Sequence, residues 1–180
     1  MPNYIRPRRP GATIYFEVCL QTRGSTLLID EINRLRMAVG LTRRAHPFHV
    51  QAWVVLPDQM HTIWTLPSDD ADYSTRWRQI KSRFSRGLPR QTRTASQLAR
   101  AERGIWQRRY WEHHITSQKD LEAHMAFCHA LPVNRGLCNR PADWPYSSFN
   151  RPAVGCVLAR TTTRPGRDTV TAWGDHPNHR

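Results

Sequence analysis

Two neighbouring apolar segments, FHVQAWVVL at residues 48–56 and MHTIWTL at residues 60–66, decide the fold. Both are rich in the β-branched and aromatic side chains that are typical of strands. The three residues PDQ at 57–59 separate them and indicate a turn. We therefore predict two strands joined by a short connection at the centre of the domain.

The residues before this pair predict a strand followed by a helix. Residues 14–21 (IYFEVCLQ) have the composition of a strand, with glycines on either side. Residues 25–39 carry apolar side chains at helical spacing, and Gly40 predicts the end of that helix. The apolar positions are Leu28, Ile32, Leu35 and Val39.

The residues after the pair predict a helix, a loop, a short strand and a last helix. The helix covers residues 74–88, and its apolar stripe is Trp77, Ile80 and Phe84. Residues 89–103 are polar and predict a loop, and residues 111–115 predict a short strand. The sequence SQKD at 117–120 matches a capping box, so a helix should begin there and end at Pro132.

The order strand, helix, strand, strand, helix, strand, helix predicts a ferredoxin-like α+β fold. We expect an antiparallel sheet with helices on one face plus a C-terminal helix. Residues 1–150 should form this single domain. Residues 151–180 contain Pro, Gly, Thr and Arg without periodicity, and we expect them to be a mobile tail.

The charge of the chain favours a polyanionic partner. There are 27 basic and 14 acidic residues, which gives a formal net charge of +13, and Lys81 and Lys119 are the only lysines. Such an excess suits phosphate contacts, and arginine also stacks on bases. No apolar run approaches membrane-spanning length, so we expect a cytoplasmic protein with no membrane partner. The four cysteines form no CxxC pair, and we expect reduced thiols.

Three basic regions are candidates for DNA contact. The first is an N-terminal arm, the second decorates the helix at 74–88, and the third lies between two aromatic residues, an arrangement suited to phosphate contact beside stacking. In chain order the candidates are Arg6, Arg8, Arg9, Arg76, Lys81, Arg83, Arg86, Arg108 and Arg109.

Several stretches together resemble the REP-associated tyrosine transposases, relatives of the HUH-motif single-tyrosine transposases. They are the opening MPNYIRPRRPGATIYFEV, the central VVLPDQMHTIWTLPSDDADYSTRWRQIKSRFS, and then GIWQRRYWEHHI, DLEAHMAFCHALPVNRGL and DWPYSSF. The resemblance covers residues 1–150 in order. It implies binding of single-stranded or hairpin DNA from palindromic repeats.

The resemblance also implies a chemistry of strand cleavage and rejoining. A tyrosine attacks a phosphodiester and forms a 5′-phosphotyrosine, with the help of a divalent metal such as Mg²⁺ or Mn²⁺. Two histidines flanking an apolar strand residue, and an amide one helical turn after the tyrosine, hold the metal. Alternate strand residues share a face, and so do helix residues four apart, so these groups can converge on one ion.

This sequence departs from the family pattern at three of those four positions. The strand motif reads Gln59-Met60-His61, so the first histidine is a glutamine. Phe127 stands at the nucleophile position without a hydroxyl, and Leu131 stands at the amide position without a lone pair. We therefore expect DNA binding with impaired cleavage and doubtful metal binding through Gln59 and His61.

Several alternatives stay open. His124 shares a helix stripe with Phe127 and is a candidate replacement metal ligand beside His61. An active enzyme would use Gln59, His61 and a substitute nucleophile, for which Tyr73 and Tyr110 are candidates. His113 and His114 lie on a strand, where one should face each side.

An arginine-rich RNA-binding protein on the same scaffold is the last alternative. RNA-recognition modules of this shape stack bases on aromatic residues of the central strands. Phe16 and Trp64 are the strand aromatics that would have to do so. The sequence predicts neither the oligomeric state nor the target bases.

Overall fold

A four-stranded antiparallel sheet organises the domain, and the computed structural model describes residues 7–150 of it. The sheet order within these residues is β2-β3-β1-β4. This is the ferredoxin-like α+β arrangement that the sequence predicts. Arg6 and the expected tail at 151–180 lie outside the described residues. The strands are β1 (Thr13–Cys19), β2 (His49–Val55), β3 (Gln59–Thr65) and β4 (Trp111–His114).

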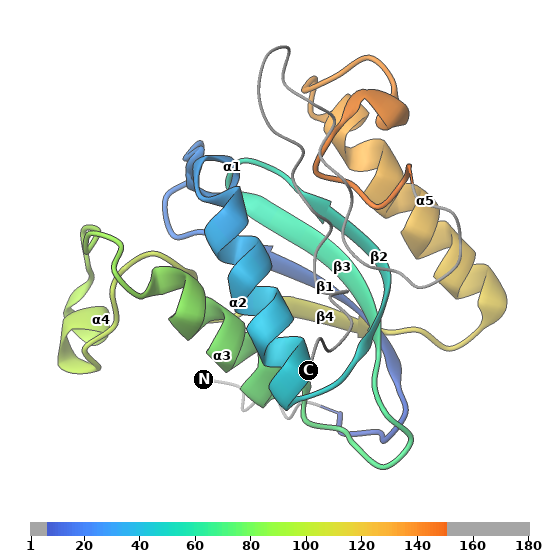
Figure 1. Ribbon diagram of the computed structural model, residues 1–180, viewed down its shortest axis with the longest axis horizontal. Coiled ribbons are helices and arrows are strands. Elements are labelled where there is room, and N and C mark those ends of the chain that lie inside the picture. Colours follow the sequence, from blue (N-terminus) through green and yellow to red (C-terminus); the bar gives the residue numbers. More distant parts are fainter. Residues whose placement is uncertain (1–6, 151–180) are drawn as a thin grey trace, which may run out of the picture.

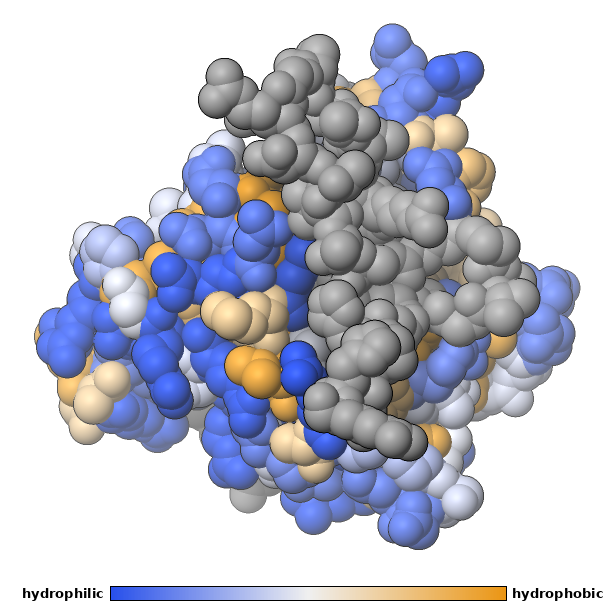
Figure 2. Space-filling view, in the orientation of Figure 1, coloured by the Kyte–Doolittle hydropathy of each residue, from blue (hydrophilic) through white to orange (hydrophobic). Residues whose placement is uncertain are grey.

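Helices cover both faces of the sheet. Figure 1 shows α2 and α3 side by side over one face, while α5 lies across the other, against β2 and β3. Hydrophilic residues cover most of the visible outer surface of α2, α3 and α4 (Figure 2). None of the helices in residues 7–150 is long and apolar enough to cross a membrane. The helices are α1 (Leu27–Asp30), α2 (Ile32–Ala45), α3 (Tyr73–Ser85), α4 (Ala95–Ala99) and α5 (Gln118–Asn134).

The larger core lies between the sheet and the pair α2 and α3. The stripe predicted on α3 is confirmed, because Trp77, Ile80 and Phe84 are fully buried there. The rings of Trp64 and Trp77 stack with centroids 4.3 Å apart. Phe16 and Trp64 are both fully buried in this core. The proposal that they stack on RNA bases is therefore wrong, because helices cover the face on which they lie.

The smaller core lies between the sheet and α5. Its buried members come from three strands or their ends and from one helix: Tyr15, Ala52, Val54, Leu56, Ile63, Cys128 and Leu131. Period-two alternation explains the division, since Tyr15 faces α5 while its neighbour Phe16 faces α2 and α3. The positions that the family resemblance marks all lie on this second face.

Several elements differ from the sequence prediction, and the helix predicted at 25–39 is divided into α1 and α2. Gly40 does not end its helix, because α2 runs on to Ala45 and buries Thr42 against the domain. Pro132 lies inside the last turns of α5, where its missing N–H removes one hydrogen bond near the end of the helix. The polar segment 89–103 contains α4, which begins with a capping box between Thr94 and Gln97.

Candidate functional site

The strand motif is presented by β3 towards α5. Met60 is fully buried in the larger core, so alternation turns Gln59 and His61 to the opposite face. Gln59 is fully buried and His61 is 2% exposed. Two neighbours on β1, Tyr15 and Cys19, contact them across the sheet.

Hydrogen bonds occupy both ring nitrogens of His61. Its Nδ1 lies 2.6 Å from the Tyr15 hydroxyl, and its Nε2 lies 3.0 Å from the amide nitrogen of Gln59. The Gln59 oxygen accepts a hydrogen bond of 2.8 Å from the Arg23 guanidinium. Because the Gln59 nitrogen can only donate, the His61 Nε2 must accept, and its Nδ1 then carries the proton that is donated to Tyr15.

His61 is a neutral imidazole in this setting. Burial lowers its pKa from 6.5 to about 4, and the positive charges of Arg135 and Arg23 act in the same direction. Burial also raises the pKa of the Tyr15 hydroxyl well above its ordinary value. The two partners therefore form a neutral hydrogen-bonded pair at physiological pH.

The helix positions lie beside this pair. Phe127 is 47% exposed, and its ring meets those of His61 and Tyr15 edge-to-face at centroid distances of 6.1 and 6.2 Å. Leu131, one turn further along α5, is buried in the smaller core with Cys128. The scaffold thus keeps Phe127 close to His61, although the side chain has no hydroxyl.

These residues do not fit a divalent cation at the family's position. A guanidinium already lies on the Gln59 oxygen that would have to be a ligand, and its positive charge would repel the ion. The two His61 nitrogens are engaged with Gln59 and Tyr15. Leu131 offers a hydrocarbon surface where the pattern has an amide oxygen.

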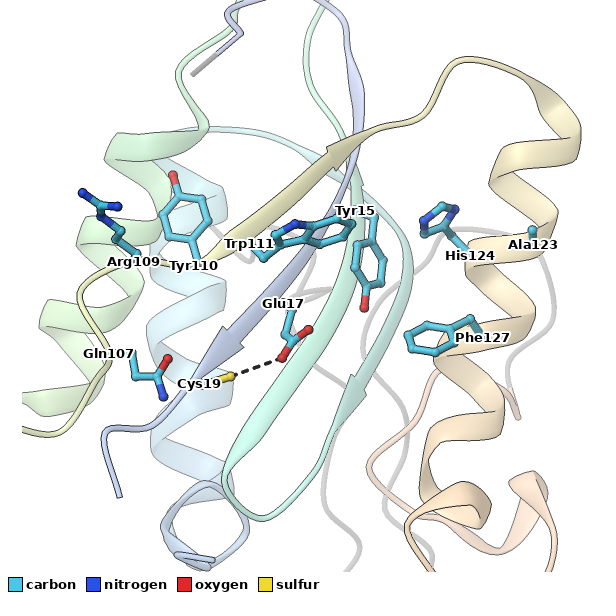
Figure 3. A pocket seen from close by; sticks show the side chains of 10 residues that line it. All are labelled: Tyr15, Glu17, Cys19, Gln107, Arg109, Tyr110, Trp111, Ala123, His124 and Phe127. Atoms are coloured by element: carbon cyan, nitrogen blue, oxygen red, sulfur yellow. Dashed lines mark hydrogen bonds between the residues drawn. The ribbon is translucent and has the colours of Figure 1, made fainter. Parts of the chain in front are cut away.

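A cavity of about 620 Å³ opens over the strand β1, beside α5 and the residues that lead into β4. Figure 3 shows Phe127 and His124 reaching towards it from α5 and the Trp111 indole lying over β1, while the guanidinium of Arg109 points outward at its far side. The Tyr15 ring forms part of its wall. The lining residues are Tyr15, Glu17, Cys19, Gln107, Arg109, Tyr110, Trp111, Ala123, His124 and Phe127.

Tyr15 is the site residue that sequence reasoning missed. It lies on the strand predicted at 14–21, and nothing local distinguishes it from a core aromatic. The pairing of β1 with β3 places Glu17 opposite His61, so the adjacent Tyr15 and His61 share one face. Alternation combined with that strand pairing is the signal that would have found it.

The histidines of β4 face opposite sides, as the strand pattern predicts. His113 stacks on His124 with ring centroids 4.6 Å apart, whereas His114 packs near Tyr73 on the other face. The Asp120 carboxylate lies within 3.0 Å of nitrogens on both His113 and His124. The ring of His124 also lies 5.0 Å from that of Tyr15. Its predicted role as a ligand beside His61 stays a prediction.

The two candidate substitute nucleophiles have different surroundings. Tyr73 is 1% exposed and donates a hydrogen bond of 2.9 Å to the Pro7 carbonyl, among residues of the larger core. The sheet separates it from His61, so we do not retain it as a nucleophile. Tyr110 packs near Phe16 and lies 3.3 Å from the Ser74 hydroxyl, but it also lines the cavity.

The predicted DNA-contact residues divide into exposed and internal ones. Arg76 is only 1% exposed, and its guanidinium donates to the carbonyls of His46, Pro47 and Asp72 and to the Asp70 carboxylate. Its prediction as a phosphate contact is therefore wrong, since the structure uses it to fasten the start of α3. The exposed arginines among these candidates are Arg8, Arg9, Arg86, Arg108 and Arg109.

The two remaining candidates on α3 are partly buried. Lys81 donates to the Gln107 carbonyl at 2.8 Å and lies over the rings of Trp106 and Tyr110. Arg83 donates to the Gln79 side chain at 3.0 Å. Each side chain has further N–H donors besides the one used here, so their contact with a phosphate stays a prediction.

Comparison with known proteins identifies relatives over most of the chain. No family model matches it. The REP-associated tyrosine transposase of Escherichia coli K12 is 40% identical over 151 residues, which is 84% of each chain. A solved structure of a REP-associated tyrosine transposase bound to a REP hairpin covers 99% of this chain and 100% of its own, with a TM-score of 0.73 and 34% identity. The chain belongs to the REP-associated tyrosine transposase family.

Proposed function

We propose that this protein binds hairpin or single-stranded DNA of palindromic repeats and does not cleave it through a tyrosine at the family's position. The observation that carries the proposal is the closed arrangement around His61. Phe127 stands at the nucleophile position, and Tyr15, Gln59 and Arg23 occupy the polar atoms that the chemistry would need. Each of these groups is already satisfied within the protein.

The loss of cleavage follows from the chemistry of the side chains. Phosphoryl transfer needs an oxygen nucleophile and positive charge at the phosphate oxygens where negative charge develops. A phenyl ring supplies no nucleophile, and the buried neutral His61 supplies no charge. The Gln59 oxygen already accepts a hydrogen bond from Arg23, so it does not serve as a metal ligand.

DNA binding does not depend on those positions. The net charge of +13 favours phosphates, and the exposed arginines among the candidates lie at the N-terminal arm, at the end of α3 and before β4. Arg109 is exposed, and both it and Trp111, which is 54% exposed, line the cavity (Figure 3). An exposed guanidinium and an open indole at one cavity suit contacts with a phosphate and a base. The similar structure mentioned above contains a REP hairpin, which agrees with this partner.

The test uses a labelled hairpin from a palindromic repeat together with Mn²⁺. We expect a retarded complex in a native gel and no protein–DNA band after denaturation. A matched RNA hairpin should bind more weakly, and tighter RNA binding would contradict the choice of DNA. A covalent band formed by the unmodified protein would contradict the loss of cleavage.

Residual cleavage by another tyrosine is the second candidate function. Tyr15 and Tyr110 both line the cavity beside Phe127, and this observation favours them over other tyrosines of the described part of the chain. Burial raises the pKa of Tyr15 and so disfavours its phenolate. If a covalent band forms, Tyr15→Phe and Tyr110→Phe assign it, since only the variant that lacks the nucleophile loses the band.

A further inference from the structure

Three side chains at the junction of β4 and α5 form a compact cluster apart from the family's metal positions. Asp120 Oδ2 lies 3.0 Å from His113 Nε2, and Asp120 Oδ1 lies 2.9 Å from His124 Nδ1. One nitrogen or oxygen from each residue lies within 4.8 Å of the other two. The two imidazole rings stack almost in parallel, at an angle of 12°.

The backbone fixes this arrangement. Alternation on β4 turns His113 towards α5, and the hydroxyl of Ser117 caps α5 by accepting from the Asp120 amide. Asp120 and His124 are four residues apart and therefore share a helix face. The backbone amide of Thr116 donates to Asp120 Oδ2 at 3.0 Å, which orients the carboxylate. The strand β4 and the helix α5 thus hold the three candidate metal ligands close together.

The donor set and its spacing suit a transition-metal ion. Zinc is bound tetrahedrally by imidazole nitrogens and carboxylate oxygens at about 2.0–2.2 Å, so two ligands of one ion lie roughly 3.3 to 3.6 Å apart. The two separations from Asp120 are 3.0 and 2.9 Å, so side-chain shifts of a few tenths of an ångström bring them into that range. Two imidazoles and one carboxylate favour such borderline ions over Mg²⁺, which prefers oxygen ligands.

We propose that His113, Asp120 and His124 bind a divalent transition-metal ion of the zinc class. The side chains are 37%, 20% and 23% exposed, so an ion can enter from solvent and keep water on its remaining positions. His124 Nδ1 gives up its hydrogen bond to the Asp120 carbonyl, which measures 2.9 Å, and binds the ion through its lone pair. This site needs neither Gln59 nor His61, and its existence does not depend on DNA binding.

The position of the cluster gives the ion a consequence for the cavity. His124 lines the cavity, and Phe127 follows it by one turn of α5. Three protein ligands leave at least one coordination position of a four-coordinate ion for water or an anion. The ion would also link β4 to α5 directly.

Titration of the purified full-length chain with Zn²⁺, without DNA, tests the proposal. Calorimetry should show one ion per chain, and Co²⁺ should give the visible absorption of a nitrogen- and oxygen-ligated ion. His113→Ala, Asp120→Asn and His124→Ala should each weaken binding by about tenfold or more, since even loss of an outer-shell partner has effects of that order. Asp120→Asn keeps the shape of the side chain and an acceptor for Thr116, so it stays informative if a histidine variant unfolds.

Two control variants decide where the ion sits. His49→Ala removes an exposed histidine of β2, and His61→Ala removes the histidine at the family's position. Neither should change the affinity for Zn²⁺. Equal weakening by His49→Ala would mean unspecific surface binding and would overturn the proposal. Loss through His61→Ala with no effect of Asp120→Asn, or the absence of a one-to-one site in the unmodified chain, would overturn it as well.

Discussion

The two faces of the sheet have different interiors. The face under α2 and α3 is filled by large apolar rings, among them Trp53, Trp64 and Trp77, all fully buried. The face under α5 has a small apolar cluster and beside it the buried polar side chains of Gln59 and His61. The cavity opens on this second face. The first face therefore supplies most of the close packing, whereas the second holds a polar, partly open site.

Repair of the second face should have the largest effect. The triple variant Gln59→His, Phe127→Tyr and Leu131→Asn should form a covalent adduct with hairpin DNA in the presence of Mn²⁺. Phe127→Tyr alone should form at least about a thousandfold less, because residues of such a site act as a unit. Denaturing electrophoresis measures the adduct. Gln59→His with Leu131→Asn, without the tyrosine, is the matched control and should give none.

The outcome of this repair also tests the geometry. Circular dichroism should first show that the triple variant is folded, and a native gel should show that it binds the hairpin. If both hold and no adduct appears, then Phe127 does not stand at the nucleophile position. In that case, adding Tyr15→Phe to the triple variant, which frees His61 Nδ1, should still give no adduct.

The contrast in packing predicts a large difference in stability. Trp64→Ala should lower the free energy of unfolding by about 3–5 kcal/mol, because it leaves a cavity in the closely packed larger core. Phe127→Ala should change it by no more than about 1 kcal/mol, because that ring is 47% exposed. Urea denaturation of both variants measures the difference. Equal losses of unfolding free energy would show that Phe127 is packed as tightly as Trp64 and would contradict the contrast between the two faces.

Acid should destabilise the second face through His61. Its pKa is about 4 in the folded protein and near 6.5 in the unfolded chain, so the unfolded chain takes up the proton first. Stability should fall as the pH drops from 6.5 towards 4, by an amount on the order of 3 kcal/mol for this group, and level off below that. Urea denaturation at pH 7 and pH 5 checks it. His61→Asn should flatten the decrease, and an unchanged slope would show that other groups cause it.

Substitution of the arginines should have the smallest effects on DNA binding, and these are measured from its dependence on salt concentration. Arg6, Arg8 and Arg9 changed together to Ala should weaken hairpin binding and reduce the slope of log affinity against log salt by up to about 2 to 3. Arg109→Ala should reduce it by about 1 or less. Arg76→Lys should affect stability and leave the salt slope alone, because that guanidinium is internal. An unchanged slope in the triple variant would remove the arm from the interface.

Much of the fold could be predicted because it depends on local patterns. The stripe Trp77, Ile80 and Phe84 reports which side chains of α3 face the interior, and the structure confirms it. Gly40 and Pro132 misled the prediction of helix ends. Their helices continue because packing of the surrounding residues outweighs a weak local preference.

The site could be predicted only in part. The family resemblance assigns Gln59, His61 and Phe127 to one region, and the structure brings His61 and Phe127 together there. The partners that close the region come from far along the chain, since Tyr15 is 46 residues from His61 and Arg23 is 36 residues from Gln59. Arg76 shows the converse, because a charged residue on a helix can be internal when carbonyl oxygens surround it.

The burial of Leu131 also bears on the mutational paths open to this sequence. An asparagine there, introduced alone, would place an amide beside Cys128 and Ile63, where an unpaired polar group is unfavourable by about 1–3 kcal/mol. A histidine at position 59, introduced alone, would remove the oxygen that accepts from Arg23. Each single step towards the family pattern thus lowers stability before it can restore any chemistry. A route that changes one residue at a time therefore passes through less stable variants before any of them can regain activity.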